Sequence, residues 1–186
     1  VKMAEMLRFA INTPVDEEEL RRCALLCKTD LVTGMVIEFT ELQGVMGREY
    51  ALLDGEKPEV ATGIFEHYLP RFAGDALPAT TIGRIVGIGD KLDNICATFS
   101  RGLAPTGSQD PYALRRQALG VINILIDANY HISLAKIIAG TLYLLDIKPE
   151  ETGKLVPQIM EFFKQRLRNL LMDQGIRYDV IDAVFA

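Results

Sequence analysis

The chain has 186 residues, 49% hydrophobic and 24% charged, a composition typical of a soluble globular protein with one or two domains. Its formal net charge of -5 argues against a DNA-binding protein or a general nucleic-acid binder, so any RNA contact requires a local basic patch. The three cysteines disfavour a disulfide framework and predict a reducing, cytoplasmic location, with Cys23 and Cys27 as buried core thiols. No apolar run reaches the roughly 18 residues that a membrane span needs.

Both ends of the chain lie within helical patterns. The stretch from Val1 to Ile11 reads as the end of a helix, and the pattern at the other end runs through Ala186. Because the chain also has no initiator Met and no signal peptide, we expect it to be a piece of a longer protein.

A long amphipathic helix is the next element that the sequence predicts. Thr13 is expected to cap it and Pro14 to occupy its first turn, so the helix should run from about Pro14 toward Leu53, with a bend or interruption near residues 28–34. Its central part has apolar residues at spacings of three and four, the pattern of a buried helical stripe. The stripe consists of Leu31, Val32, Met35, Val36, Phe39, Leu42 and Met46.

The remainder of the chain also has helical periodicity, and no stretch alternates with period two for long. The predicted fold class is therefore all-α, an irregular helical bundle. Asp110 is expected to cap one helix that starts at Pro111, and Pro157 to lie in the first turn of another. A soft boundary separates residues 1–147 from a helical extension, 148–186, that leads to the next domain. The expected helices are Pro58–Leu69, Thr80–Phe99, 110–128, Ser133–Leu145, 156–173 and 179–186.

Three glycines lie on one side of the helix expected at Thr80–Phe99. They are Gly83, Gly87 and Gly89. Because a glycine inside a helix costs about 1 kcal/mol relative to alanine, a run of three needs a structural reason. We expect this side of the helix to pack closely against a neighbouring element.

Possible metal ligands occur in A-L-L-C-K-T-D at residues 24–30, I-F-E-H-Y-L-P-R-F-A-G-D at 64–75 and I-V-G-I-G-D-K-L-D at 85–93. In order and spacing these stretches resemble an HD phosphohydrolase domain, which holds a metal with a His-Asp doublet, further histidines and a late Asp. The resemblance implies that the doublet falls on Cys27-Lys28, or on Thr29-Asp30, and that the late Asp is Asp90. His67 stands where a His-His pair is usual, with Tyr68 in place of the second His.

This donor set is too small for a catalytic metal. A metal needs about four to six donors, the chain has only two His, and Lys28 would repel a cation. We therefore expect an HD-like scaffold without a metal and without catalysis. His67 is interpreted as a structural imidazole, and Asp90 as a partner of Lys91, Arg84 or a helix terminus. A metal-dependent HD phosphohydrolase is the alternative.

The stretch R-G-L-A-P-T-G-S-Q-D-P-Y-A-L-R-R at residues 101–116 is the best candidate for a local basic patch. A loop of small residues leads into a helix start, where free backbone N–H groups can bind a phosphate. We predict that RNA contact, if this chain makes it, uses Arg101, Arg115 and Arg116, with Lys91 as a further candidate. Tyr112 offers a face for base stacking.

Other interpretations of these basic residues stay open. Asp110 would repel an anion at the helix start, and Arg115 and Arg116 are also suited to pair with Glu38 and Glu41, which share a helix face at i,i+3. No nucleophile or metal signature accompanies that carboxylate pair, so acid–base catalysis is not predicted. A second basic run is interpreted as a solvated helix face, with RNA contact as the alternative. It consists of Lys164, Arg166 and Arg168.

Longer segments suggest a family. They are T-D-L-V-T-G-M-V-I-E-F-T-E-L-Q-G-V-M-G-R-E-Y-A at residues 29–51, E-H-Y-L-P-R-F-A-G-D-A-L-P at 66–78, G-D-K-L-D at 89–93 and P-T-G-S-Q-D-P-Y-A-L-R-R-Q-A-L-G at 105–120. Together and in this order they resemble the β subunit of the bacterial two-subunit glycyl-tRNA synthetase.

The resemblance implies a role in charging tRNA(Gly) with glycine. In that family a heterotetramer of α and β subunits carries out the reaction, with the aminoacylation site for glycine, ATP and Mg on the α subunit. The β subunit resembles a tRNA-binding partner, and this chain would be the part that contains its degenerate HD-like domain, with no cofactor of its own. A purely structural spacer between domains is the other alternative.

Overall fold

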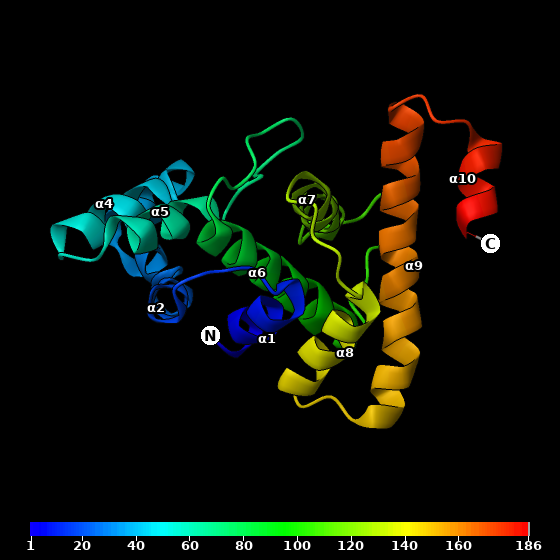
Figure 1. Cartoon of the computed structure of the whole chain (residues 1–186), viewed down its shortest axis with the longest axis horizontal. Helices are drawn as coiled ribbons and strands as arrows, with labels where there is room; N and C mark the ends of the chain where they lie inside the picture. The colour runs from blue at the N-terminus through cyan, green and yellow to red at the C-terminus, as the bar shows by residue number, and fades with distance from the viewer. Residues whose placement is uncertain (186) are drawn as a thin grey trace.

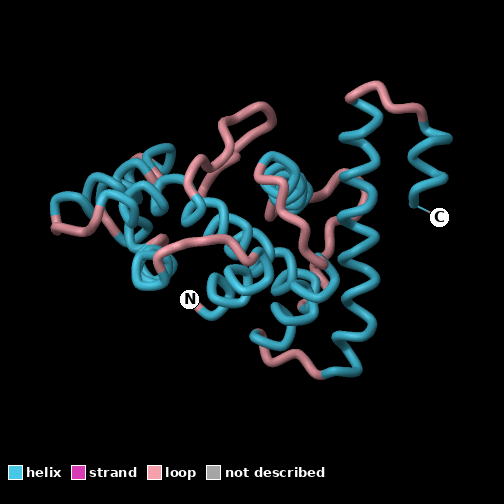
Figure 2. The backbone as a smooth tube through the Cα atoms, viewed as in Figure 1, coloured by secondary structure: helices cyan, strands magenta, loops and turns pink. Residues whose placement is uncertain are grey.

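The computed structural model describes residues 1–185, which form helices and connecting loops without a β-strand (Figures 1 and 2). The predicted all-α class is confirmed, while the likeness to an HD scaffold stays a prediction. Within the described range, no helix combines the length and the apolarity needed to cross a membrane. In chain order the elements are α1 (Lys2–Ile11), α2 (Glu17–Leu26), the 3-10 turn η1 (Thr29–Val32), α3 (Gly34–Glu38), the 3-10 turn η2 (Thr40–Leu42), α4 (Val45–Leu53), α5 (Pro58–Glu66), α6 (Thr81–Ser100), α7 (Leu114–Asp127), α8 (Leu134–Leu144), α9 (Pro149–Asp173) and α10 (Tyr178–Phe185).

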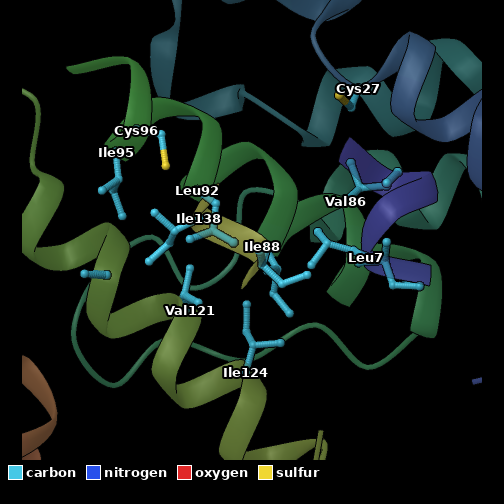
Figure 3. Packing of buried hydrophobic residues seen from close by; sticks show 14 of the residues in the cluster. Leu7, Cys27, Val86, Ile88, Leu92, Ile95, Cys96, Val121, Ile124 and Ile138 are labelled. Atoms are coloured by element: carbon cyan, nitrogen blue, oxygen red, sulfur yellow. The ribbon is translucent and has the colours of Figure 1, made fainter. Parts of the chain in front are cut away.

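Helix α6 lies at the centre of the fold, because six other helices pack against it. Thr80 caps its start, and the Thr80 hydroxyl oxygen accepts the backbone N–H of Gly83. Twelve of its twenty residues are buried, so it is covered on several sides rather than along one stripe. Figure 3 shows apolar side chains that gather around it from α1, α7 and α8, among them Leu7, Val121, Ile124 and Ile138.

Two of the three glycines of α6, Gly83 and Gly87, mark close approaches, as predicted, whereas Gly89 does not. A Cβ atom on Gly87 would lie 3.1 Å from the carbonyl oxygen of His67, in the chain that leaves α5. On Gly83 it would overlap the Glu66 side chain, whereas on Gly89 it would meet Leu7 at an ordinary 3.4 Å. At Gly87 the close neighbour is therefore backbone, which would have to shift to admit even a Cβ atom.

The predicted helix from Pro14 toward Leu53 is interrupted near residues 28–34, as expected, but its predicted extent is wrong because the interruption continues to Gly44. Helices α2 and α4 form at its two ends, and between them lie the 3-10 turns η1 and η2 and the short helix α3. The predicted cap at Thr13 is also wrong, because the Asp16 carboxylate accepts the backbone N–H of Glu19 at 2.9 Å and starts α2 there.

The connection between α2 and α4 does not bury the predicted apolar stripe. Gly44 has a φ of 77°, a left-handed conformation that interrupts a helix, and the Thr33 hydroxyl starts a new short helix, α3. Val36 is buried, but five large apolar side chains of this connection are each at least 39% exposed. We call these five residues the apolar segment: Leu31, Val32, Met35, Ile37 and Phe39.

Helix α7 starts at Leu114, three residues after the predicted Pro111. The Asp110 carboxylate accepts the backbone N–H groups of Leu114 and Arg115, so it satisfies the helix start as predicted, but from further upstream. Ala113, with a φ of 52°, separates Pro111 from the helix.

Helix α9 is continuous from Pro149 to Asp173, so the predicted helix start near Pro157 is wrong. Pro157 removes one backbone hydrogen bond from the helix interior. Burial on both sides of it maintains the helix, since Leu155 and Ile159 belong to the same apolar core as α6 and α8. The domain boundary at residue 148 stays a prediction.

Candidate functional site

The residues at the predicted HD-like positions meet around one ion pair. Lys28 follows α2 and places its Nζ 2.9 Å from Oδ2 of Asp90 on α6. The same ammonium lies 4.4 Å from the ring centroid of Tyr68, whose ring is 3.9 Å from that of His67. We call the following residues the polar cluster: Lys28, Asp30, His67, Tyr68 and Asp90.

Asp30 anchors the irregular connection after α2. It is 2% exposed, and its Oδ2 accepts the backbone N–H of Gly44 at 2.6 Å. Its Oδ1 accepts the hydroxyl of Tyr68 at 3.2 Å. Burial, and then the charge of Asp30, raise the pKa of Tyr68, so the phenol stays protonated and continues to donate. These contacts give the carboxylate a structural role.

His67 is fully buried and neutral. Its Nδ1 lies 2.6 Å from the carbonyl oxygen of Ile64, so Nδ1 carries the hydrogen and donates it. Burial, followed by the charge of Lys28, lowers the pKa of His67 to about 3. Within residues 1–185 no group forms a hydrogen bond with Nε2, so the predicted structural imidazole is satisfied on one nitrogen only.

Lys91 is a buried structural lysine, which corrects two predictions. It is 5% exposed, and its Nζ donates to the carbonyl oxygens of His67 at 3.0 Å and Leu69 at 2.8 Å. Burial lowers its pKa to about 8. It therefore cannot join an RNA-binding surface, and it is not the ion-pair partner of Asp90. Arg84, the other predicted partner, pairs with a carboxylate of α7.

The polar cluster does not fit a metal ion. The Lys28 ammonium already neutralises Asp90 and would repel a cation placed there. Cys27 is the first residue of one predicted doublet. Burial raises the pKa of its thiol and disfavours the thiolate that a metal requires. Among the residues that the structure describes, no three His, Cys, Asp or Glu side chains are grouped to hold a metal. The donors needed for the phosphohydrolase alternative are thus not assembled here.

A second set of charged residues lines a groove of about 410 Å³ between α7, α9 and the loop before α6. Figure 1 shows this loop rising from the start of α6 toward α7, with α9 beyond. Arg115 and Arg116 of α7 and Arg166 of α9 line the groove, together with Phe72 of the loop. No carboxylate in residues 1–185 lies within 4 Å of these three guanidinium groups. We call it the arginine groove.

The residues predicted to contact RNA are only partly brought together. Arg115 lines the groove and donates from Nη2 to the carbonyl oxygen of Gly107 at 2.6 Å, whereas Arg116 is exposed. Arg101 is exposed at the end of α6, outside the groove lining, at the other end of the loop that leads to α7. Tyr112 is 52% exposed and also lies outside the groove lining.

The predicted pairing of these arginines with Glu38 and Glu41 is wrong. Both glutamates are exposed, and neither forms an ion pair in the described part of the chain. Sequence reasoning missed Phe72 and treated Arg166 as part of a solvated face. The signal for Phe72 was an aromatic residue next to an arginine in a Pro- and Gly-containing loop.

Comparisons with known proteins all point to the same family. A family profile described as glycyl-tRNA synthetase beta subunit matches residues 1–186. A glycine–tRNA ligase beta subunit from Desulforamulus reducens is 54% identical over 187 aligned positions, which cover 98% of this chain and 27% of the relative. Proteins of the same name from Syntrophomonas wolfei and Clostridioides difficile are 52% and 54% identical, over 91% and 92% of this chain and 25% of each relative.

The chain therefore spans about a quarter of the length of the curated relatives that it matches. The match includes all four segments that carried the resemblance in the sequence, and it extends through α9 and α10. The chain belongs to the glycyl-tRNA synthetase beta subunit family.

Proposed function

We propose that this chain supports the ATP-dependent charging of tRNA(Gly) with glycine, as a non-catalytic part of a β subunit. The family assignment supports the reaction, and the name of the relatives supports a partner subunit of another kind. On this proposal the α subunit holds the aminoacylation site with ATP and Mg, while this chain contacts tRNA and the α subunit. The three free cysteines are buried, in keeping with a reducing, cytoplasmic location.

The observation that supports tRNA contact is a set of arginines that form no ion pair within residues 1–185. Arg115 and Arg116 are consecutive at the start of α7, and Arg101 is exposed at the far end of the preceding loop. In a chain of net charge -5, such a local cluster is the kind of surface that attracts a phosphate backbone. Contacts of this type position an RNA without reading its sequence.

Assembly with the α subunit has a different candidate surface, the apolar segment. Its side chains are exposed within nine consecutive residues, and Val32 and Ile37 are 81% and 67% exposed. Several large exposed apolar residues on one short segment are typical of a protein–protein contact. The exposed carboxylate of Glu38 beside it, which forms no ion pair in the described part of the chain, favours a partner surface with basic residues at its edge.

One experiment on the assembled two-subunit enzyme tests both contacts with Arg116→Glu and Ile37→Glu, because both residues are exposed. Arg116→Glu should raise the KM for tRNA several-fold and reduce the salt dependence of tRNA binding by about one phosphate contact. Glycine activation without tRNA should stay unchanged. Ile37→Glu should release the α subunit at dilutions where the wild-type complex stays intact in size-exclusion chromatography.

Each variant is the control for the other. A change in tRNA binding for Ile37→Glu in the assembled complex, or in subunit assembly for Arg116→Glu, would show that the two surfaces are not separate. If both variants assemble and charge tRNA like the wild type, both proposed contacts are refuted, which favours the structural spacer or an RNA surface elsewhere on the chain.

A further inference from the structure

The loop between α5 and α6 carries Phe72 at the arginine groove. The ring is 56% exposed and lines the groove. Beside it, the backbone N–H and Nε of Arg71 both donate to Oδ2 of Asp75 at 2.9 Å, and the hydrogen bonds from Arg71 lower the pKa of Asp75 to about 2. At the end of the loop, the buried Glu66 carboxylate accepts the backbone N–H of Thr80 at 3.0 Å. These hydrogen bonds stabilise the loop that carries Phe72.

A single exposed ring is ordinary on a protein surface. Phe72 differs from such a ring because arginine side chains line the same groove. Arg166 is half-buried in the same groove, its guanidinium lies 4.1 Å from the ring centroid of Phe162, and its Nη1 donates to the carbonyl of that residue at 2.9 Å. Arg115 lines the same groove, and burial, followed by the positive charge of Arg115, lowers the pKa of Arg166.

The acidic neighbours only partly offset this positive charge. Asp110 acts on Arg166 in the opposite direction, but its carboxylate is engaged by the backbone at the start of α7. Asp173, at the end of α9, is the one carboxylate among the described residues that line the groove. Three arginines against one aspartate leave an excess of positive charge that favours an anionic ligand.

The ligand that satisfies both features has a flat aromatic face and negative charge. Phe72 supplies a face for stacking, and the apolar side chain of Leu119 lies in the same lining. A nucleotide combines these properties, since its base stacks on aromatic side chains and its phosphate accepts from guanidinium groups. In a double helix the bases are already stacked and are not free to lie on a protein ring.

We propose that the arginine groove binds an unpaired nucleotide of RNA, with its base stacked on Phe72 and its phosphates against Arg115, Arg116 and Arg166. This inference rests on the proposed function, because it specifies that the chain contacts an unpaired segment of tRNA. Stacking on an aromatic ring tolerates every base, so the groove selects single-stranded RNA rather than a sequence.

The test uses the assembled two-subunit enzyme and a labelled single-stranded RNA of about eight nucleotides, with the same sequence in a duplex for comparison. Three substitutions separate the contributions of Phe72: Phe72→Ala removes the side chain, Phe72→Leu keeps apolar bulk without a ring, and Phe72→Trp keeps an aromatic face. Tyr143→Ala is the matched control, since Tyr143 is 77% exposed on α8 and lies outside the groove lining.

Phe72→Ala and Phe72→Leu should weaken binding of the single strand about tenfold in fluorescence anisotropy. Phe72→Trp and Tyr143→Ala should bind it at least as tightly as the wild type, and duplex binding should not change for any of them. Thermal melting of each variant establishes that it is folded.

The inference is overturned if Phe72→Ala binds the single strand as Tyr143→Ala does, or if it weakens the duplex equally. In that case Arg116→Glu decides the fate of the proposed function. If Arg116→Glu still raises the KM for tRNA, phosphate contact stands and only stacking is lost. If it does not, the RNA surface lies elsewhere and both proposals fail.

Discussion

The polar cluster and the arginine groove both gather charged groups next to α6 and its connections, but they differ in how those groups are partnered. In the polar cluster, Lys28 has Asp90 at 2.9 Å and the Asp30 carboxylate has two donors. In the groove, Arg115 and Arg166 line the same surface, and no carboxylate of the described chain is within 4 Å of either guanidinium group.

This difference separates a structural role from a binding role. A buried charge that has lost its partner must stay desolvated without compensation, so substitutions in the polar cluster should act on the free energy of unfolding. Arg115 and Arg116 have no such partner in the described chain: Arg115 donates to a single carbonyl oxygen and Arg116 is exposed, so both contribute little to stability and are free to meet a ligand. Substitutions in the groove should therefore act on binding.

The largest effect is expected where α6 meets the backbone of the polar cluster, at Gly87. A side chain there would collide with the carbonyl group of His67, because even a Cβ atom would lie 3.1 Å from its oxygen. We expect Gly87→Leu to lower the free energy of unfolding by about 3 kcal/mol, at the upper end of the cost of overpacking. Chemical denaturation of the two-subunit enzyme and its variant measures this loss.

Gly153→Leu is the matched control, because a Cβ on Gly153 meets no atom within 4 Å. Gly153 is exposed in α9, so this substitution should leave stability unchanged or raise it slightly. Equal denaturation midpoints for the two variants would mean that Gly87 does not face a closely packed backbone.

A smaller effect is expected from the ion pair itself. Lys28 is 40% exposed and Asp90 is 23% exposed, so solvent reduces the strength of their hydrogen bond. We expect Lys28→Met to lower the free energy of unfolding by about 1–2 kcal/mol, which includes the lost contact with the Tyr68 ring.

A double-mutant cycle with Asp90→Asn isolates the pair. The double variant should be less destabilised than the sum of the two single variants, by about 1 kcal/mol. Strict additivity would mean that the two charges do not depend on each other. It would contradict the view that the charges of the polar cluster are structural partners.

The parts of the fold that the sequence predicted well are those with local signals. The helix at α6 was predicted within one residue at each end, since Thr80 is a cap and the apolar residues that follow it are dense. The connection between α2 and α4 was not, although its apolar spacing suits a helix. There the conformation depends on long-range contacts, above all those of Asp30 with Gly44 and Tyr68. The periodicity of apolar residues in the sequence cannot predict such contacts.

The same distinction applies to the candidate sites. Arg115 and Arg116 were predicted because they are adjacent in sequence and follow a loop. Phe72 and Arg166 join them only through the packing of α7 against α9 and the course of the loop after α5. Lys28 and Asp90 are 62 residues apart, so the sequence could show that a metal set was incomplete but not that an ammonium stands beside the remaining carboxylate.

The smallest effect is expected at the one acidic side chain lining the described part of the groove, and it should change binding without a loss of stability. Asp173 is the last residue of α9, where a negative charge opposes the helix dipole, so Asp173→Asn should raise the free energy of unfolding by at most about 0.5 kcal/mol. Removing this charge should also tighten binding of the single-stranded RNA about twofold at low salt, with the gain fading at high salt. Asp54→Asn is the matched control, since Asp54 is exposed at the end of α4 and outside the groove lining. It makes the same change in net charge. An equal gain in affinity for both variants would therefore show that the gain comes from overall charge and not from a phosphate bound in the groove. A gain confined to Asp173→Asn would place the RNA phosphate beside the three arginines.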